Sequence, residues 1–283
     1  MKTLILALLL IFNIYSQSWV DDWQKAVVSI GVVDSLQYKV QNQIYYKNYF
    51  RVVGTGVLFY VKIDTTSIPV LVTAKHVFYL PEENWEPKSL NLRFASDEDK
   101  PVDEYFGIPI RLQNQNQKTW IPHVDSKVDI ACFLLKISDI PEISGVKVLP
   151  YSMIATNEDL YQGAKVFVLG YPGSVGMVFW TKAILREGII AWVPPDKTHE
   201  NKILIDCDIF PGNSGGPVFK VPFGVDKNGN VLSGGKIQFA GIVSQSFLSP
   251  TQVKLGNKEI IDQMGNKFHS FESIGIGVIE PSS

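Results

Sequence analysis

Short apolar runs rich in β-branched and aromatic residues recur along the whole chain, and polar turns separate them. Runs of this kind are typical of β-strands, whereas an amphipathic helix repeats its apolar positions about every 3.6 residues over a longer stretch. No long helical pattern is evident. The pattern therefore predicts an all-β protein, a sandwich or a barrel. The expected strands cover residues 28–33, 52–61, 70–73, 90–94, 108–112, 130–135, 166–169, 202–206, 218–221, 236–244 and 274–279.

Two pairs of these strands are predicted to form hairpins. A polar segment at residues 64–67 joins the runs at 52–61 and 70–73, and Asn228-Gly229 provides a strong hairpin turn further on. The polar, tyrosine-rich stretch at residues 37–49 leads into the first of these runs and is not predicted as a strand. Residues 150–162 do not show the strand pattern, and we place the connection between two barrels there.

Composition and charge exclude several classes of partner. The chain has 283 residues, of which 46% are hydrophobic and 19% charged, as in ordinary globular proteins. A formal net charge of −2 gives no electrostatic case for nucleic acid or an anionic membrane. Asp226 opens a segment similar to a calcium loop, but Ile237 stands where that loop needs a glutamate. We therefore predict no metal and no cofactor.

The first residues are typical of a signal peptide. Lys2 supplies a positive start, residues 4–12 are apolar, and Ser16-Gln17-Ser18 offers small residues for cleavage. The apolar run is shorter than the about 20 residues that span a bilayer. We predict a signal peptide at residues 1–18 and an exported protein, periplasmic or secreted, without membrane contact after cleavage. An uncleaved anchor is the alternative.

The segment Pro211-Gly212-Asn213-Ser214-Gly215-Gly216-Pro217 holds a serine between glycines. Glycine allows a sharp bend and a close approach of a substrate backbone. The N–H groups of Gly212 and Ser214 are candidates for an oxyanion hole, which stabilises the charge that develops in acyl transfer. The alternative is an ordinary turn, because the same residue types dominate turns.

Two further motifs supply the partners that a nucleophilic serine needs. Thr73-Ala74-Lys75-His76 follows an apolar run, and Asp129 opens the apolar run that ends at Leu135. The order His76, Asp129, Ser214 resembles that of the chymotrypsin-like (trypsin-fold) serine proteases and differs from the subtilisin and α/β-hydrolase orders. The chain is most similar to the bacterial HtrA-type proteases, because Asn213 precedes the serine. Further matching pieces are Gly54-Thr55-Gly56, Gly170-Tyr171-Pro172, Gly188-Ile189-Ile190 and Gly241-Ile242-Val243-Ser244.

The resemblance implies two antiparallel six-stranded β-barrels with the active site in the cleft between them. Residues 19–150 would form the N-terminal barrel, carrying His76 and Asp129, and residues 151–283 the C-terminal barrel, carrying Ser214. Ser214 would be the nucleophile, His76 the general base and then acid, and Asp129 the group that orients the imidazole. Asp125 is the rival carboxylate. The implied reaction is hydrolysis of a polypeptide substrate through an acyl-enzyme.

The resemblance also suggests specificity residues. It places Ser244, Ser246, Gly275 and Gly277 around the primary pocket, and it places Asp208 where trypsins carry the aspartate that binds lysine or arginine. HtrA-type proteases do not use the residue at this position to bind lysine or arginine. Cys132 and Cys207 would lie in different barrels as buried free thiols.

Asn213 cannot form the ion pair by which trypsin-like zymogens are activated, so activation by N-terminal cleavage is not expected. No PDZ domain is expected after the last strand.

Two other functions share this fold. A catalytically silent binding or chaperone-like protein would keep the barrels without the chemistry, and such proteins generally lose a triad residue. All three triad candidates are present here. An esterase would use the same triad on small esters. The sequence predicts neither an oligomeric state nor a natural substrate.

Overall fold

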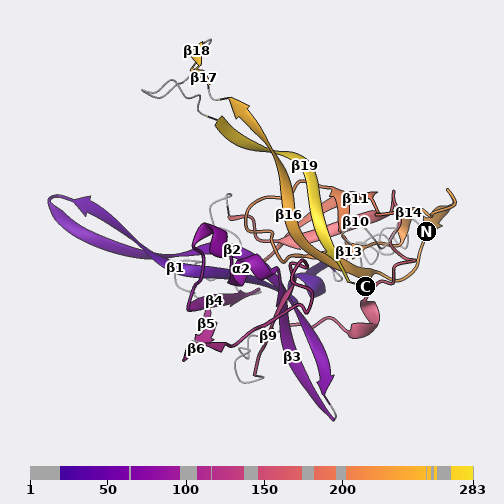
Figure 1. Cartoon of the computed structure of the whole chain (residues 1–283), viewed down its shortest axis with the longest axis horizontal. Coiled ribbons are helices and arrows are strands. Elements are labelled where there is room, and N and C mark those ends of the chain that lie inside the picture. Colours follow the sequence, from indigo (N-terminus) through magenta and orange to yellow (C-terminus); the bar gives the residue numbers. More distant parts are fainter. Residues whose placement is uncertain are drawn as a thin grey trace, which may run out of the picture.

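The computed structural model describes residues 20–63, 65–95, 107–115, 117–136, 146–173, 182–195, 202–252, 254–255, 258–259 and 269–282. The predicted signal peptide at residues 1–18 lies outside this part of the chain. Across the described ranges, no helix combines the length and hydropathy needed to cross a membrane. Strands dominate both halves of the molecule (Figure 1), so the predicted all-β class is confirmed.

The N-terminal half is a seven-stranded antiparallel sheet in the order β5-β4-β1-β2-β3-β9-β8. Its edge strands β5 and β8 do not pair with each other in the described part, so the sheet is a half-barrel with one strand more than the six predicted. The expected hairpin of β2 and β3 is confirmed. The strands are β1 (Val27–Val40), β2 (Gln43–Ile63), β3 (Thr66–Thr73), β4 (Ser89–Phe94), β5 (Ile108–Arg111), β8 (Ile121–Pro122) and β9 (Ala131–Leu134), with β6 (Gln113–Asn114) and β7 (Gln117–Lys118) as a separate pair.

The C-terminal half is a closed barrel in the order β10-β11-β12-β19-β16-β13, and it has the six strands predicted. The hairpin expected at Asn228-Gly229 is also confirmed, as β14 pairs with β15. The barrel strands are β10 (Lys165–Gly170), β11 (Ile184–Trp192), β12 (Ile203–Asp206), β13 (Pro217–Lys220), β16 (Gln238–Gln252) and β19 (His269–Pro281); the hairpins add β14 (Phe223–Val225), β15 (Val231–Ser233), β17 (Lys254–Leu255) and β18 (Lys258–Glu259). Short helical turns are α2 (Lys75–Phe78), η1 (Pro81–Glu83) and η4 (Tyr151–Met153).

Aromatic side chains join the two halves. Trp23 stacks on Phe219 of β13 with ring centroids 4.3 Å apart, and Phe59 of β2 meets Phe239 of β16 edge to face at 5.0 Å. Phe219 and Phe239 thereby belong to the hydrophobic core of the N-terminal half, although both lie on strands of the C-terminal barrel. The halves therefore pack through shared apolar surface, which favours one fixed relative position.

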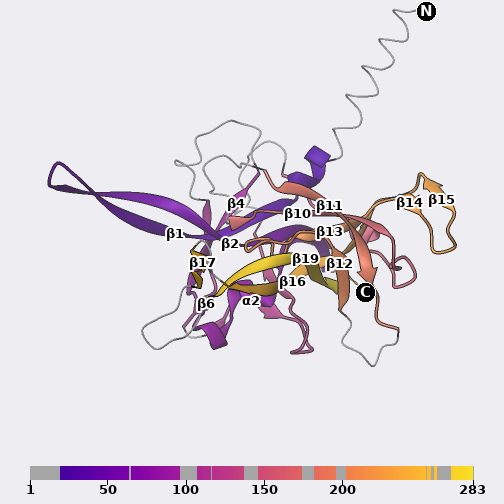
Figure 2. The same ribbon diagram turned by 90° about the horizontal axis from the view of Figure 1, so that it is seen from above.

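Two pairs of strands, β1–β2 and β16–β19, extend well beyond the sheets to which they belong. The β1–β2 pairing continues to Val40 and Gln43, and Gln41 and Asn42 form the turn with φ of 46° and 67°. Two positive φ values are typical of the type I′ turn, which matches the twist of a hairpin. Figures 1 and 2 show this ribbon projecting from the body of the molecule. The stretch at residues 37–49, for which no strand was predicted, is therefore strand on both sides of a two-residue turn.

Thr55 of β2 ties the N-terminal half to the loop that carries Ser214. Its side chain is fully buried. The Thr55 hydroxyl donates to the carbonyl of Gly212 (2.7 Å) and accepts from the N–H of Tyr171 (3.0 Å), while its own N–H donates to the carbonyl of Ser214 (2.8 Å). Thr73 donates from its hydroxyl to the carbonyl of Thr55 at 2.6 Å. One side chain thus fixes the serine loop against the strand that leads to the histidine.

Replacement of Thr55 by valine keeps the shape and the strand propensity but removes the hydroxyl. We expect Thr55→Val to lower the free energy of unfolding by about 3 kcal/mol, because the carbonyl of Gly212 and the N–H of Tyr171 lose their partner in the interior. Urea denaturation measures this. Thr66→Val, at an exposed position of β3, is the control and should change stability by less than about 0.5 kcal/mol. Equal effects of the two variants would contradict this role of Thr55.

Candidate active site

His76 lies on α2, a single turn that follows β3 directly. The turn closes where the N–H of Tyr79 donates to the carbonyl of Lys75 at 2.9 Å, and the indole of Trp85 donates to the carbonyl of Val77 at 2.9 Å. Val77 is buried, so its side chain anchors the turn on the core. The histidine is thereby presented at the end of the strand on a segment fixed from both sides.

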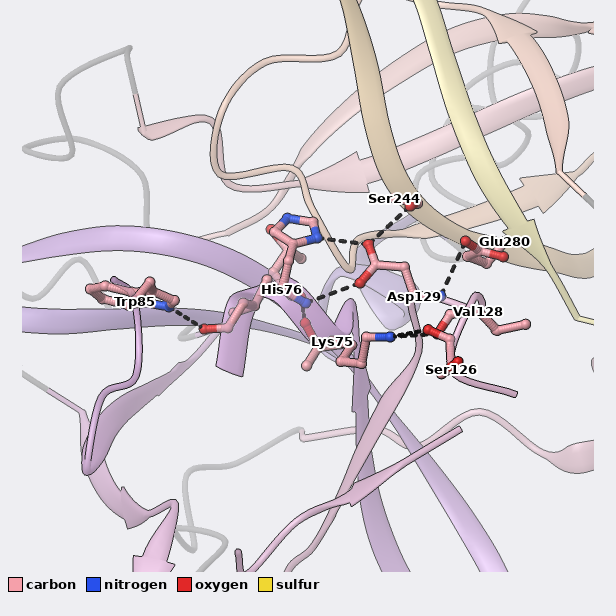
Figure 3. Close-up of polar contacts among 11 residues, drawn as sticks. Lys75, His76, Trp85, Ser126, Val128, Asp129, Ser244 and Glu280 are labelled. Atoms are coloured by element: carbon pink, nitrogen blue, oxygen red, sulfur yellow. Dashed lines mark hydrogen bonds and ion pairs between the residues drawn. The ribbon is translucent and has the colours of Figure 1, made fainter. Parts of the chain in front are cut away.

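Asp129 holds this histidine through two hydrogen bonds. One carboxylate oxygen accepts from the main-chain N–H of His76 at 3.0 Å, and the other lies 2.7 Å from the ring Nδ1 (Figure 3). The main chain is joined as well, because the N–H of Lys75 donates to the carbonyl of Asp129 at 3.2 Å. The Lys75 ammonium donates to the carbonyls of Ser126 and Val128, and these bonds fix the segment that precedes Asp129. Ring, main chain and carboxylate therefore form one rigid unit.

The pKa of Asp129 lies below its ordinary value of 3.8. Burial alone would raise it, but the hydrogen bonds and the charge of His76, with a smaller contribution from Ser244, outweigh that effect. The carboxylate is therefore ionised at neutral pH and acts only as an acceptor. In the neutral form of the His76 ring, Nδ1 therefore carries the hydrogen and Nε2 presents a lone pair, on the side of the ring that points away from Asp129 in Figure 3.

Two side chains of the C-terminal barrel complete the surroundings of Asp129. The hydroxyl of Ser244 on β16 donates to the same carboxylate oxygen as the ring, at 2.9 Å. The main-chain N–H of Asp129 donates to the carboxylate of Glu280 on β19 at 3.2 Å. Both residues are almost fully buried. Sequence reasoning assigned Ser244 to the specificity pocket and missed Glu280, whose only signal is an acid directly after the apolar run of the last strand.

Ser214 lies on a loop whose shape depends on two glycines with left-handed backbone angles. Gly212 has a φ of 96° and Gly215 a φ of 82°. A Cβ on Gly215 would lie 2.1 Å from both the carbonyl of Thr55 and the hydroxyl of Thr73, so no larger residue fits there. Among the described residues, the N–H groups of Gly212 and Ser214 donate to no protein acceptor, whereas those of Asn213, Gly215 and Gly216 do. The two candidate oxyanion donors are therefore available to a ligand.

The three candidate catalytic side chains line one open cleft of about 640 Å³ between the two halves. No hydrogen bond joins the Ser214 hydroxyl to His76 within the described part of the chain, as is common before substrate binds. Charged side chains of both signs are among the lining residues. The N-terminal half contributes Lys75, His76, Tyr79, Leu80, Pro81, Glu82, Glu83, Lys127 and Asp129, and the C-terminal half Lys202, Ser214, Ser244, Gln245 and Ser246.

The remaining predicted residues lie at different places. Ser246 lines the cleft, whereas Asp208, Gly275 and Gly277 are not among its described lining residues. Asp208 is exposed, and its carboxylate lies 3.5 Å from where a Cβ of Gly275 would be. Gly277 of β19 pairs with Ser246 on the neighbouring strand β16. The role of these residues in specificity stays a prediction.

The rival carboxylate Asp125 contacts its own loop. Its side chain accepts from the N–H of Lys127 at 2.9 Å, and its N–H donates to the ring of His123 at 3.1 Å. The structure brings Asp129, and not Asp125, to His76.

Both cysteines are free thiols, as predicted. Cys207 is buried, while Cys132 is only partly so. Burial raises the pKa of Cys207 to about 11, with nearby Arg186 opposing the shift and Asp206 and Asp208 adding to it. Burial also raises the pKa of Cys132. Neither sulfur is therefore a thiolate at neutral pH.

Comparison with known families agrees with this geometry. The family model described as Trypsin-like peptidase domain matches residues 54–222, well over half of the chain, and the match contains His76, Asp129 and Ser214. No curated protein matches the chain significantly. With its β-barrel architecture and the family match, the chain belongs to the trypsin-like peptidases.

Proposed function

We propose that the protein is an exported serine endopeptidase that cleaves peptide bonds with Ser214, His76 and Asp129. The observation that carries the proposal is that Asp129 forms hydrogen bonds with both the ring and the main-chain N–H of His76, in the cleft that Ser214 also lines. A carboxylate that fixes the ring in this way selects the tautomer a general base needs. Export rests on the sequence of residues 1–18 alone.

In the proposed reaction, the Ser214 oxygen attacks the carbonyl carbon of the scissile bond while Nε2 of His76 takes the hydroxyl proton. The imidazolium is stabilised by the ionised Asp129, whose other partners Ser244 and Glu280 keep it in place. The carbonyl oxygen becomes negative and receives hydrogen bonds from the N–H groups of Gly212 and Ser214. Collapse breaks the C–N bond, and the leaving amine takes the proton from Nε2.

The same groups then remove the acyl group from Ser214. A water molecule gives its proton to Nε2 and attacks the ester carbonyl, and the proton returns to the Ser214 oxygen as the acid departs. Each proton leaves and returns through one histidine nitrogen.

The cleft supports a polypeptide rather than only a small ester. β16 bonds to β13 and the serine loop as far as Val243, and beyond it the cleft-facing edge at residues 244–246 has no strand partner in the described part of the sheet. An unpaired edge beside a nucleophile accepts an extended peptide through main-chain hydrogen bonds. The orientation of a peptide bond at Ser214 can therefore come from the substrate backbone.

A fluorophosphonate probe tests the nucleophile directly. We expect the protein to form one covalent adduct, located at Ser214 by mass spectrometry of the digested protein, because the probe reacts with activated serines. Ser214→Ala should give no adduct and should lower peptide hydrolysis by a factor of about 10⁴ to 10⁶. A folded protein that stays unlabelled would overturn the proposal in favour of a silent binding protein. Labelling with turnover of esters but not of peptides would favour an esterase.

Two variants of Glu280 test how Asp129 is held. Glu280→Gln keeps an oxygen that can accept from the N–H of Asp129, whereas Glu280→Leu does not. We expect Glu280→Leu to lower kcat about tenfold with little change in KM, and Glu280→Gln to stay within about threefold. Steady-state kinetics on a short peptide measure both. Equal rates for Glu280→Leu and the unchanged protein would show that this contact does not position Asp129.

The lowered pKa of Asp129 predicts a pH dependence of stability. A carboxyl whose pKa is lower when folded stabilises the protein above its unfolded pKa, near 3.8, and this contribution disappears as the pH falls through the folded pKa. The free energy of unfolding of the unchanged protein should therefore exceed that of Asp129→Asn most at pH ~6, and the difference should shrink towards pH ~2.5. Urea denaturation at each pH measures it. A difference that is constant across this range would contradict the assignment.

A further inference from the structure

The β1–β2 ribbon, residues 33–51, presents the largest group of exposed apolar side chains in the described part of the chain. Away from its base it packs on neither sheet and projects into solvent (Figures 1 and 2). Its exposed members are Val33, Leu36, Tyr38, Val40, Ile44, Tyr45, Tyr46 and Tyr49. Side chains of this kind rarely gather on a free surface without a binding role.

One face of the ribbon carries a row of apolar side chains, which Lys47, opposite Leu36, interrupts on β2. Leu36, Tyr38 and Val40 alternate along β1, and the register places Tyr45 opposite Tyr38, and Tyr49 further along β2, on the same face. Tyr38 and Tyr45 stack with ring centroids 5.6 Å apart. These side chains are each between 40% and 57% exposed, so the row offers on the order of 400 Å² of apolar surface. We call it the aromatic row.

The ribbon also offers unpaired main-chain groups. β4 pairs with β1 only from Val28 to Gly31, and β3 pairs with β2 only from Gly56 onward. Between these limits and the turn, both outer edges of the ribbon lack a strand partner among the described residues. Such edges accept a further extended chain through backbone hydrogen bonds.

The base of the ribbon lies beside the candidate oxyanion hole. Along β2, Thr55 bonds to the carbonyls of Ser214 and Gly212, and the side chain of Val52 lies 3.3 Å from where a Cβ of Gly212 would be. Continuing from Val52 toward lower residue numbers leads directly onto the ribbon. A chain that crosses Ser214 and passes Gly212 therefore meets the ribbon next.

Area favours a substrate chain over a second copy of the protein. The row is smaller than the about 800 Å² that each partner of a stable dimer buries. A substrate chain that already lies in the cleft does not need an interface of that size, because the row only adds to the contacts that the chain makes at Ser214.

We propose that the aromatic row and the edges of the β1–β2 ribbon bind an extended, apolar stretch of the polypeptide substrate beyond the cleft. The proposal deepens the proposed function and rests on it. Long, unfolded chains would then be preferred over short peptides that occupy the cleft alone.

Binding to an inactive protein tests the ribbon without hydrolysis. The background is Ser214→Ala in the full chain, and the probe is fluorescein-labelled, reduced and carboxymethylated α-lactalbumin, an unfolded acidic polypeptide. We expect the added substitutions Tyr38→Ser and Tyr45→Ser to weaken the Kd from fluorescence anisotropy about tenfold or more. Tyr60→Ser, at an exposed tyrosine of the same strand outside the ribbon, is the matched control and should leave the Kd unchanged.

Equal binding by the ribbon variant and the control would overturn the proposal. So would a dimer in sedimentation velocity that the ribbon variant converts to a monomer, because the occupant would then be a second copy. In the protein that keeps Ser214, the ribbon variant should lose about tenfold in kcat/KM for the unfolded protein and nothing for a short peptide; loss on both substrates would also overturn it. If the unchanged protein fails to react with a fluorophosphonate but the binding difference remains, the ribbon stands as a polypeptide site and only the proposed hydrolysis fails.

Discussion

The buried hydroxyl of Thr55 is the contact on which the geometry of the site depends. Histidine and aspartate come from one half and serine from the other, so the proposed chemistry requires that the two halves be held in a fixed position. Thr55 bonds to the carbonyls of Gly212 and Ser214 through its hydroxyl and its N–H. The aromatic contacts of Phe219 and Phe239 supply apolar attraction between the halves, while the hydrogen bonds supply direction.

Asp129 is held from both halves in a similar way. His76 and Lys75 bond to it from the N-terminal half, and Ser244 and Glu280 from the C-terminal barrel. Only His76 and Ser244 donate to the carboxylate itself, and their hydrogen bonds, with the charge of His76, lower its pKa in spite of the cost of burial. Movement of one half against the other would therefore alter the histidine as well as the serine loop.

The β1–β2 and β16–β19 pairs are longer than the sheets need, and the sequence revealed neither extension. Residues 37–49 are polar and rich in tyrosine, without the alternation that a half-buried strand imposes, because neither face of the ribbon is covered. Its turn, Gln41-Asn42, lacks the Asn-Gly or Asp-Gly signal. Glu280 was missed for a different reason, since the sequence at the end of a strand does not reveal which main-chain N–H lies opposite it.

The sequence by itself determined the all-β class, both predicted hairpins, and the three motifs that carry His76, Asp129 and Ser214. The spacing of apolar positions, the residue types in turns and the placement of glycines are local properties, and local properties can be read along a chain. Only the tertiary structure decided that Asp129 and not Asp125 reaches His76, that Ser244 and Glu280 bond to that carboxylate, and that a projecting ribbon begins beside Gly212. Each of these is a contact between residues far apart in the chain, and such contacts depend on how strands pair and how two sheets pack together.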